Sequence, residues 1–169
     1  MNTSAFFKYI LFASIACISF ACSVSYSLSG KSIPPDVKTF SVAYIENRAQ
    51  HIVPTLSDQV TEGLRDKYRT QAGLQMVQHN GHLQIEGRIS DYSISYQGVT
   101  ANQEAAQNRL TISVYIEFVN QMEPSKNFSR TFSASRDYDA RGVINEEVFI
   151  PEILEQILED IFMNSVATW

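Results

Sequence analysis

The sequence predicts an α+β fold: a two-layer sandwich of order β-α-β-β-β-α, in which two helices cover one face of a mostly antiparallel, four-stranded sheet. Three observations predict it. Several segments carry apolar residues at every second position, as half-buried strands do. Two other segments carry apolar stripes of helical period, and each stripe needs a surface to pack on. Packing both helices on the same face of one sheet buries both stripes.

The first strand is predicted at residues 38–45 and is followed by the first helix. Three alternate positions of the strand are apolar: Phe40, Val42 and Tyr44. The helix follows Pro54, where Thr55 and Asp58 have the spacing of a capping box. Its apolar residues lie four apart: Leu56, Val60, Leu64 and Tyr68. Gly73 favours the end of this helix.

The middle of the chain is predicted to form a meander of antiparallel strands. Its three strands are predicted at 82–97, 109–120 and 128–138, and residues 74–78 before them look like a short strand. Asn80-Gly81 is a signal for a hairpin turn before the strand at 82–97. The apolar phase of that strand shifts by one residue near Ser90-Asp91, which indicates a bulge. A turn at 123–127 joins the last two strands into a hairpin.

The second helix is predicted over residues 146–166. A wide apolar stripe marks its buried side: Ile150, Ile153, Leu154, Ile157, Leu158, Ile161 and Phe162. The remaining face is acidic, with Glu152, Glu155, Glu159 and Asp160. Pro151 is expected to lie in the first turn or to kink the helix.

Residues 1–21 have the features of a secretory signal peptide. A short polar start with Lys8 precedes an apolar run that is too short to span a membrane as a helix. Ala21 supplies the small residue that lipoprotein processing needs before a cysteine. Cys22 is therefore predicted to be lipidated and to become the mature N-terminus, with Cys17 as the alternative site.

The rest of the chain divides into a tether at 22–36, which is polar and ends in two prolines, and one domain at 37–169. Removing the signal peptide takes away one lysine and no acid, so the net charge changes from −5 to −6. Binding to nucleic acid depends on clustered lysine and arginine, so this balance argues against a nucleic-acid partner. With Cys17 in the removed segment, Cys22 has no thiol with which to form a disulfide.

Few residues indicate chemistry. His79 and His82 are the only histidine pair close in sequence, but the intervening Asn-Gly explains the segment as a turn, and no metal site is predicted. Asp137 and Asp139 have the spacing of a carboxylate pair, although such residues at the end of a strand are usual in turns. The spacing Gly-x-Ser-x-Gly and phosphate-binding glycine loops do not occur. We therefore predict neither a catalytic site nor a cofactor.

Two sets of strand residues are candidates for binding. The basic set, which we expect on the sheet or in its turns, contains Arg88, Arg109, Lys126, Arg130 and Arg136. A cluster of these side chains would attract anionic phosphates, whereas scattered ones are ordinary surface charge. The polar set, expected to form one face of the sheet, contains Thr111, Ser113, Asn120, Ser129, Thr131 and Ser133.

Several blocks together resemble the LptE family of lipopolysaccharide-assembly lipoproteins, particularly its shorter members. After Cys22 they are Tyr26 to Asp36, Pro54 to Ser57, Ala105 to Ile112, and Leu158 to Trp169. The block at Ala105 and the terminal helix are the most specific, and the resemblance covers essentially the whole mature chain.

The resemblance implies an outer-membrane lipoprotein that acts as plug and assembly partner of the β-barrel translocon LptD and contacts lipopolysaccharide. It also implies two helices on a four-stranded sheet. The residues that bind lipopolysaccharide cannot be assigned from it. Two other functions stay open on the sequence: a lipid-anchored periplasmic accessory of an ABC-type lipid transporter, and a periplasmic hydrolase.

Overall fold

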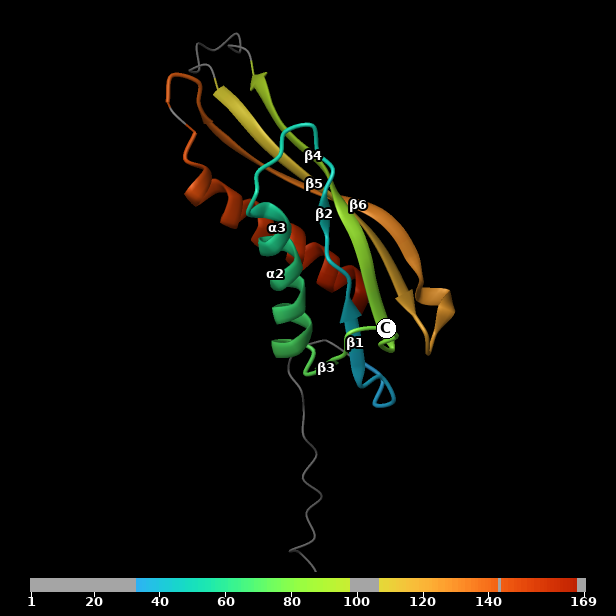
Figure 1. Ribbon diagram of the computed structural model, residues 1–169. Helices are drawn as coiled ribbons and strands as arrows, with labels where there is room; N and C mark the ends of the chain where they lie inside the picture. The colour runs from blue at the N-terminus through green and yellow to red at the C-terminus, as the bar shows by residue number, and fades with distance from the viewer. Residues whose placement is uncertain (1–32, 98–106, 143, 167–169) are drawn as a thin grey trace, which may run out of the picture. The chain divides into compact units, whose positions relative to one another are not determined.

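The computed structural model describes residues 33–97, 107–142 and 144–166. They form a mixed sheet with two helices packed on one of its faces (Figure 1), within the compact unit Lys31–Trp169. In chain order the elements are β1 (Thr39–Val42), β2 (Glu46–Asn47), α2 (Leu56–Thr70), β3 (Gln75–Met76), β4 (Leu83–Gln97), β5 (Gln107–Asn120), the short 3-10 helix η1 (Pro124–Lys126), β6 (Phe128–Asp139) and α3 (Glu146–Val166).

The α+β class and the two helices are confirmed, but the predicted sheet is wrong in strand number and direction. Six strands form one sheet in the order β3-β1-β4-β5-β6, with β2 also paired to β4. The long pairs β4–β5 and β5–β6 are antiparallel. The short pairs β1–β3, β1–β4 and β2–β4 are parallel, so the sheet is mixed.

β1 and β3 are parallel because α2 connects them, and β1 and β4 are parallel because the chain then crosses over β1 to pair with its other side. Asn80 adopts a positive φ of 56° at the crossing. A Cβ placed on Gly81 would lie 2.5 Å from the carbonyl carbon of Phe40, so the crossing backbone rests directly on β1. Asn80-Gly81 is therefore not the hairpin turn that the sequence predicted.

The first strand is shorter than predicted. β1 ends at Val42, and Tyr44 is 55% exposed instead of buried. The next residue, Ile45, is fully buried, and its N–H donates to Thr61 Oγ1 of α2 at 3.0 Å. Because the N–H of Ile45 bonds to α2 and not to a neighbouring strand, the alternation of buried and exposed residues in β1 ends before Ile45.

The two helices pack on the sheet and on each other. Every residue of the predicted stripe of α2 is 0% exposed: Leu56, Val60, Leu64 and Tyr68. Lys67 extends from α2 to α3, where its Nζ lies 2.9 Å from Glu155 and 2.8 Å from Glu159. The hydroxyl of Tyr68 makes a buried hydrogen bond with Ser165 of α3. Apolar contact and these polar contacts together hold the helices side by side.

The helix ends differ in part from the prediction. Thr55 makes no side-chain hydrogen bond to the start of α2, so the predicted capping box is wrong. Its Oγ1 instead accepts a hydrogen bond from Gln59, and Asp58 accepts one from the Tyr44 hydroxyl. Pro151 lies inside α3, near its start. Within the described ranges, neither helix is long and apolar enough to cross a membrane.

The long strands agree closely with the prediction from the sequence. The register of β4 and β5 shifts between Ile89 and Asp91, which confirms the predicted bulge. Beyond the shift Tyr92 is buried, and its hydroxyl donates to Glu146, the first residue of α3, at 2.7 Å. Because α3 begins here, the apolar residues that β4 carries beyond this point are exposed: Ile94 and Tyr96.

Candidate functional site

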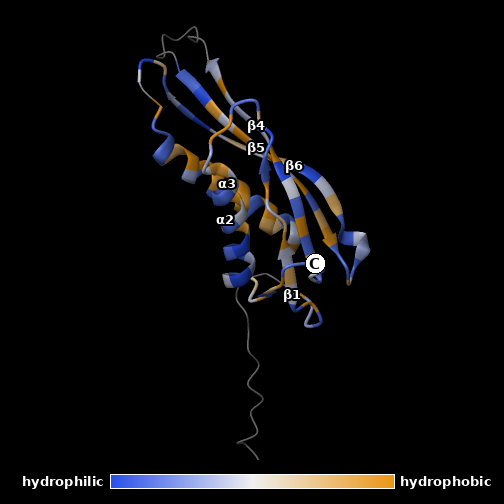
Figure 2. Cartoon of the chain, in the orientation of Figure 1, coloured by the Kyte–Doolittle hydropathy of each residue, from blue (hydrophilic) through white to orange (hydrophobic). Residues whose placement is uncertain are grey.

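The face of the sheet opposite the helices, called the uncovered face below, is the largest polar surface built from the long strands. Figure 2 shows hydrophilic and hydrophobic residues alternating along β4, β5 and β6, because successive side chains point to opposite faces. Most of the apolar positions are buried under the helices, with Ile94 and Tyr96 at the end of β4 as exceptions. The alternate positions carry hydroxyl groups: Ser93, Ser95, Thr111, Ser113, Ser129, Thr131, Ser133 and Ser135.

The register places these hydroxyl residues on neighbouring strands. Ser93 lies opposite Thr111, and Thr111 lies opposite Ser135. Ser113 lies opposite Ser133, and their hydroxyl oxygens are 2.8 Å apart, within hydrogen-bond distance. The three long strands therefore present neighbouring hydroxyl groups, which both donate and accept hydrogen bonds.

Five of the six residues predicted for the polar face lie on the uncovered face, and Asn120 is the exception. Asn120 has the phase of the buried residues of β5 and is 0% exposed. Its side-chain oxygen accepts hydrogen bonds from the backbone N–H groups of Met122 and Glu123, so it holds the turn after β5. The alternation of β5 in the sequence already places Asn120 in phase with Phe118, a signal that the prediction overlooked.

The five predicted basic residues do not form a cluster. On the uncovered face, Arg88 lies over the ring of Tyr115 at 4.3 Å, and Arg109 forms an ion pair with Asp137 at 2.6 Å. Lys126 lies in η1. The other two lie on the helix side of β6: Arg130 donates to Asn164, and Arg136 to Glu152. An anion site built from all five is therefore ruled out.

The predicted carboxylate pair is divided between two ion pairs. The hydrogen bond from Arg109 lowers the pKa of the Asp137 carboxyl, and hydrogen bonds from Arg141 lower the pKa of Asp139. Both groups are therefore ionised at neutral pH. A general acid must hold a proton at the working pH, so this arrangement does not fit a carboxylate pair in catalysis.

His79 and His82, the two histidines close in sequence, have different surroundings. His82 Nδ1 accepts a hydrogen bond from the backbone N–H of Lys38 at 3.1 Å, which occupies that nitrogen in holding the crossing. His79 lies in the wall of a cavity beside β1. Among the residues that the structure describes, no three histidine, cysteine or acidic side chains are placed to hold a metal ion.

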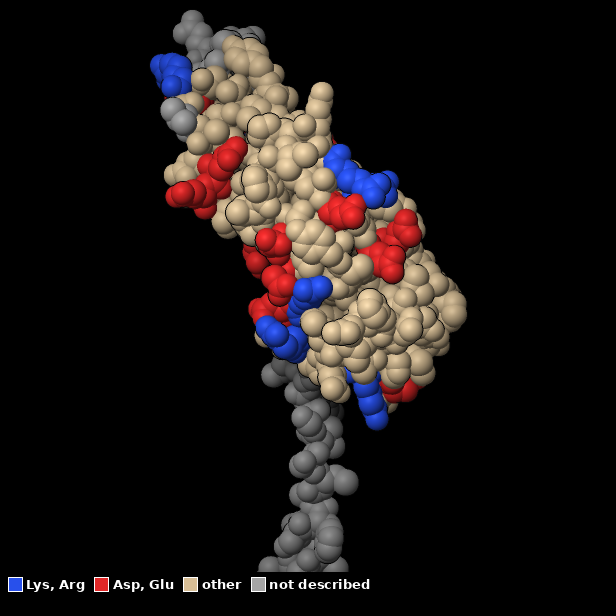
Figure 3. All heavy atoms as spheres, in the orientation of Figure 1, with Lys and Arg blue, Asp and Glu red and all other residues tan. Residues whose placement is uncertain are grey.

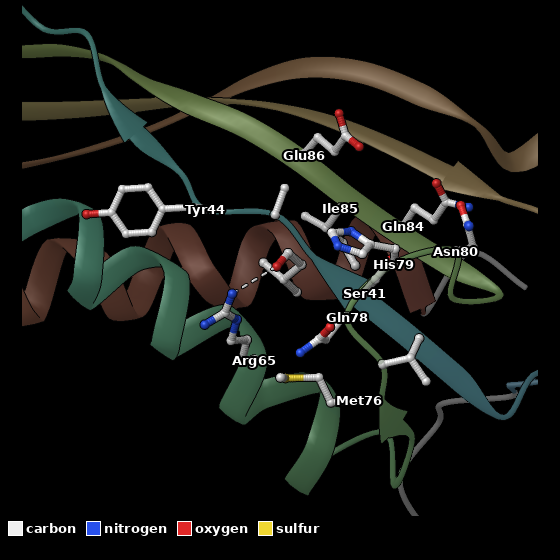
Figure 4. Close-up of a pocket in the computed structure, with 13 residues that line it drawn as sticks. Ser41, Tyr44, Arg65, Met76, Gln78, His79, Asn80, Gln84, Ile85 and Glu86 are labelled. Atoms are coloured by element: carbon white, nitrogen blue, oxygen red, sulfur yellow. Dashed lines mark hydrogen bonds between the residues drawn. The ribbon is translucent and has the colours of Figure 1, made fainter.

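A cavity of about 630 Å³ lies beside the end of β1, and sequence reasoning missed it (Figure 4). The crossing segment forms one wall with Met76 and His79, and β4 forms another with Glu86. Arg65 of α2 extends into the wall and donates to the carbonyl of Val42 at 3.1 Å. This cavity exists because the chain crosses β1, and Asn80-Gly81 is the one local signal of that crossing in the sequence.

Charge is distributed unevenly between the layers. Acidic side chains gather over the helices in Figure 3, and α3 alone carries Glu146, Glu147, Glu152, Glu155, Glu159 and Asp160. The uncovered face also carries ionisable residues, with Glu86, Arg88, Asp91 and Glu117 beside the ion pair of Arg109 and Asp137. It therefore combines hydroxyl groups with charges of both signs, whereas the charged residues of α3 are all acidic.

The predicted signal peptide and both candidate cysteines, Cys22 and Cys17, lie outside the described residues. So do most of the tether and the first residues of the block that starts at Ala105.

Two solved structures share the fold. A minor lipoprotein from Acinetobacter baumannii aligns over 80% of this chain and 95% of its own, with 18% identity and a TM-score of 0.50. A hypothetical protein from Chlamydia trachomatis aligns over 78% of this chain and 98% of its own, with 9% identity and a TM-score of 0.53. At these identities the likeness concerns the fold alone. Among curated protein sequences, none matches the chain.

The family comparison covers most of the chain. The family model for LptE, described as lipopolysaccharide-assembly, matches residues 37–165. The match begins at the buried residue before β1 and ends one residue before the end of α3, so it includes every strand and both helices. The chain belongs to the LptE family of lipopolysaccharide-assembly proteins.

Proposed function

We propose that this protein is an outer-membrane lipoprotein, anchored through Cys22, that acts as plug and assembly partner of an LptD-type β-barrel and contacts lipopolysaccharide on its way out. Membership of the LptE family supports this role. The single structural observation that carries the plug proposal is the hydroxyl-rich uncovered face of β4, β5 and β6.

A large outer-membrane barrel has a polar interior, because the side chains of its strands alternate between lipid and lumen. A plug must exchange hydrogen bonds with water for hydrogen bonds with that wall. Hydroxyl groups suit this exchange, since each one donates and accepts and none carries a charge that is costly to desolvate. The pairing of Arg109 with Asp137 neutralises one cation and one anion, each of which would otherwise need a partner in the wall.

A lipid anchor at Cys22 adds a second attachment. Several acyl chains on one residue bind a membrane firmly, whereas a single chain binds reversibly. The prolines and serines between Cys22 and Val37 provide a spacer between the anchor and the domain. The anchor keeps the domain at the membrane, and the barrel fixes its position there.

A catalytic role finds no support in the described residues. Asp137 and Asp139 are ionised in ion pairs, and His82 is occupied by the backbone of Lys38. We therefore assign the protein a structural and binding role.

Affinity purification of the tagged, lipidated protein tests the proposal. We expect a large β-barrel protein of the LptD type to be recovered with it, and Cys22→Ala to leave an unlipidated precursor with no barrel bound. Cys17→Ala is the matched control and should behave as the wild type. Recovery of soluble periplasmic proteins alone would contradict the proposal.

Two other outcomes identify the alternatives. Recovery of an inner-membrane complex in place of a barrel would indicate an accessory of an ABC-type lipid transporter. Covalent labelling of the purified protein by a serine-reactive probe would indicate a hydrolase. Fatty-acid labelling that persists in Cys22→Ala would move the anchor to Cys17.

A further inference from the structure

β6 is an unprotected edge of the sheet. It ends the strand order, and no described element lies beyond it (Figure 1). Its pairing with β5 runs from Phe128 to Asp139 without a register shift. Proteins usually protect long edges with proline, bulges or charged side chains along the strand. β6 contains no proline and no bulge, and its four charged residues are paired within the chain: Arg130 and Arg136 with α3, Asp137 with Arg109, and Asp139 with Arg141.

The hydrogen-bond pattern shows which backbone groups point outward. The N–H of Gln121 donates to the carbonyl of His82, so the odd-numbered residues of β5 bond to β4. The even-numbered residues of β5 then bond to the even-numbered residues of β6. The odd-numbered residues of β6 consequently direct their N–H and C=O groups away from the sheet: Ser129, Thr131, Ser133, Ser135 and Asp137.

These outward groups fit a second β6 strand in antiparallel orientation. Two antiparallel registers pair the greatest length of the two strands. In both, odd-numbered residues of one copy lie opposite odd-numbered residues of the other. One is centred on Ser133 and places Arg130 opposite Arg136 of the second copy, which opposes like charges. The other is centred on Ala134 and places an uncharged residue opposite each arginine: Tyr138 opposite Arg130, and Phe132 opposite Arg136.

On the uncovered face, the register centred on Ala134 also places hydrogen-bonding side chains opposite each other. Ser133 lies opposite Ser135 of the second copy, and Thr131 lies opposite Asp137, so each pair combines hydrogen-bonding groups. No like charges oppose each other between residues 129 and 139. The edge is therefore complementary to itself in one specific register.

We propose that β6 is a self-association edge, at which a second copy of this chain adds its own β6 and extends the sheet across a two-fold axis through Ala134. The inference does not depend on the proposed role in a barrel. Backbone hydrogen bonds between the odd-numbered residues hold the two copies, and the hydrogen-bonding pairs of the uncovered face, with no like charges opposed, set the register.

Light scattering on the full chain in detergent, with the protein mass separated from the detergent mass, tests the edge. We expect two chains per particle for the wild type at high concentration. The double variant S133K/S135K places lysine opposite lysine across the axis and should reduce the mass to one chain. S93K/S95K makes the same change on the uncovered face of β4, away from the edge, and should remain a dimer. Thermal melting confirms that the variants fold.

A charge-swap experiment separates a direct contact from an indirect effect. S133E/S135E should also be monomeric alone, and mixing it with S133K/S135K should restore a particle of two chains, because lysine then opposes glutamate. A wild type that stays at one chain at every concentration would overturn the inference. So would a dimer that S133K/S135K leaves intact, because the contact would then lie elsewhere.

Discussion

Lys67 shows how a charged residue is accommodated between two packed helices. Its side chain is only 8% exposed, while its two partners, Glu155 and Glu159, are 72% and 43% exposed. The lysine stem therefore packs in the helix contact and its ammonium group reaches carboxylates that water still solvates. The contribution of Lys67 comes from packing and from two charge-assisted hydrogen bonds together.

Replacing Lys67 separates these two contributions. Lys67→Ala should lower the free energy of unfolding by about 1–3 kcal/mol, because it removes both the stem and the ammonium group. Lys67→Met keeps the stem and should cost less than about 1.5 kcal/mol. Urea unfolding measures both. Arg69→Ala, which breaks an exposed pair with Asp66, is the control and should cost no more than about 0.5 kcal/mol. Equal losses for Lys67→Ala and Arg69→Ala would contradict this assignment.

Three buried or partly buried groups predict loss of stability in alkali. Burial raises the pKa of Tyr68, and burial together with Glu146 raises that of Tyr92. Burial lowers the pKa of Lys67, but the hydrogen bonds that Lys67 donates to Glu159 and Glu155 outweigh it, so the net shift is upward. A folded-state pKa above the unfolded value stabilises the fold below the unfolded pKa, and this stability is lost as pH rises toward the folded pKa.

We therefore expect the melting temperature to fall as pH rises past about 10, where the tyrosines of the unfolded chain lose their protons. Tyr68→Phe removes the ionisable hydroxyl and should make the fall less steep, at the cost of the hydrogen bond to Ser165. Melting curves from about pH 8 upward measure the slope. An unchanged slope in Tyr68→Phe would show that burial of Tyr68 does not cause the loss.

Among the elements, the crossing over β1 decides the topology of the sheet. Gly81 lies against the backbone of Phe40 and Ser41, where a Cβ would approach to 2.5–2.7 Å. Gly81→Ala should therefore displace the crossing and lower the free energy of unfolding by about 1–3 kcal/mol. Gly142→Ala, at a turn where the nearest atom would lie at 3.3 Å, is the control and should cost less. Urea unfolding checks both, and equal costs would mean that the close approach is unimportant.

The same crossing marks the limit of sequence reasoning. Local periodicity predicted the stripe of α2, the long strands and the shift near Ser90-Asp91, because each depends on residues close in the chain. Asn80-Gly81 predicted a hairpin, but a tight turn of the backbone at these residues suits a hairpin and a crossing equally. The choice between them depends on β1, which lies far away in sequence, and the cavity beside β1 was missed for the same reason.

In the whole molecule, the helix side of the sheet provides stability, and the uncovered face is the surface proposed for binding. The helix side of the sheet holds the apolar core, whereas the uncovered face contributes little apolar burial. The hydroxyl positions of this face were predictable from alternation alone. Only Asn120 was predicted on the wrong face; its side chain is buried and accepts a hydrogen bond from the turn after β5. Substitutions on the uncovered face should therefore affect partners far more than folding.

Thr111→Arg combined with Thr131→Arg tests this division. Long cationic side chains on the uncovered face reach water in the free protein, so the melting temperature should change little. Inside a barrel they would be pressed against the wall without partners, and recovery of the barrel protein with the tagged chain should fall by about tenfold or more. Gln59→Arg combined with Gln156→Arg puts the same charges on exposed positions of α2 and α3 and should reduce recovery much less. If the helix variant alone abolished recovery of the barrel, the helices rather than the uncovered face would be the side that meets it.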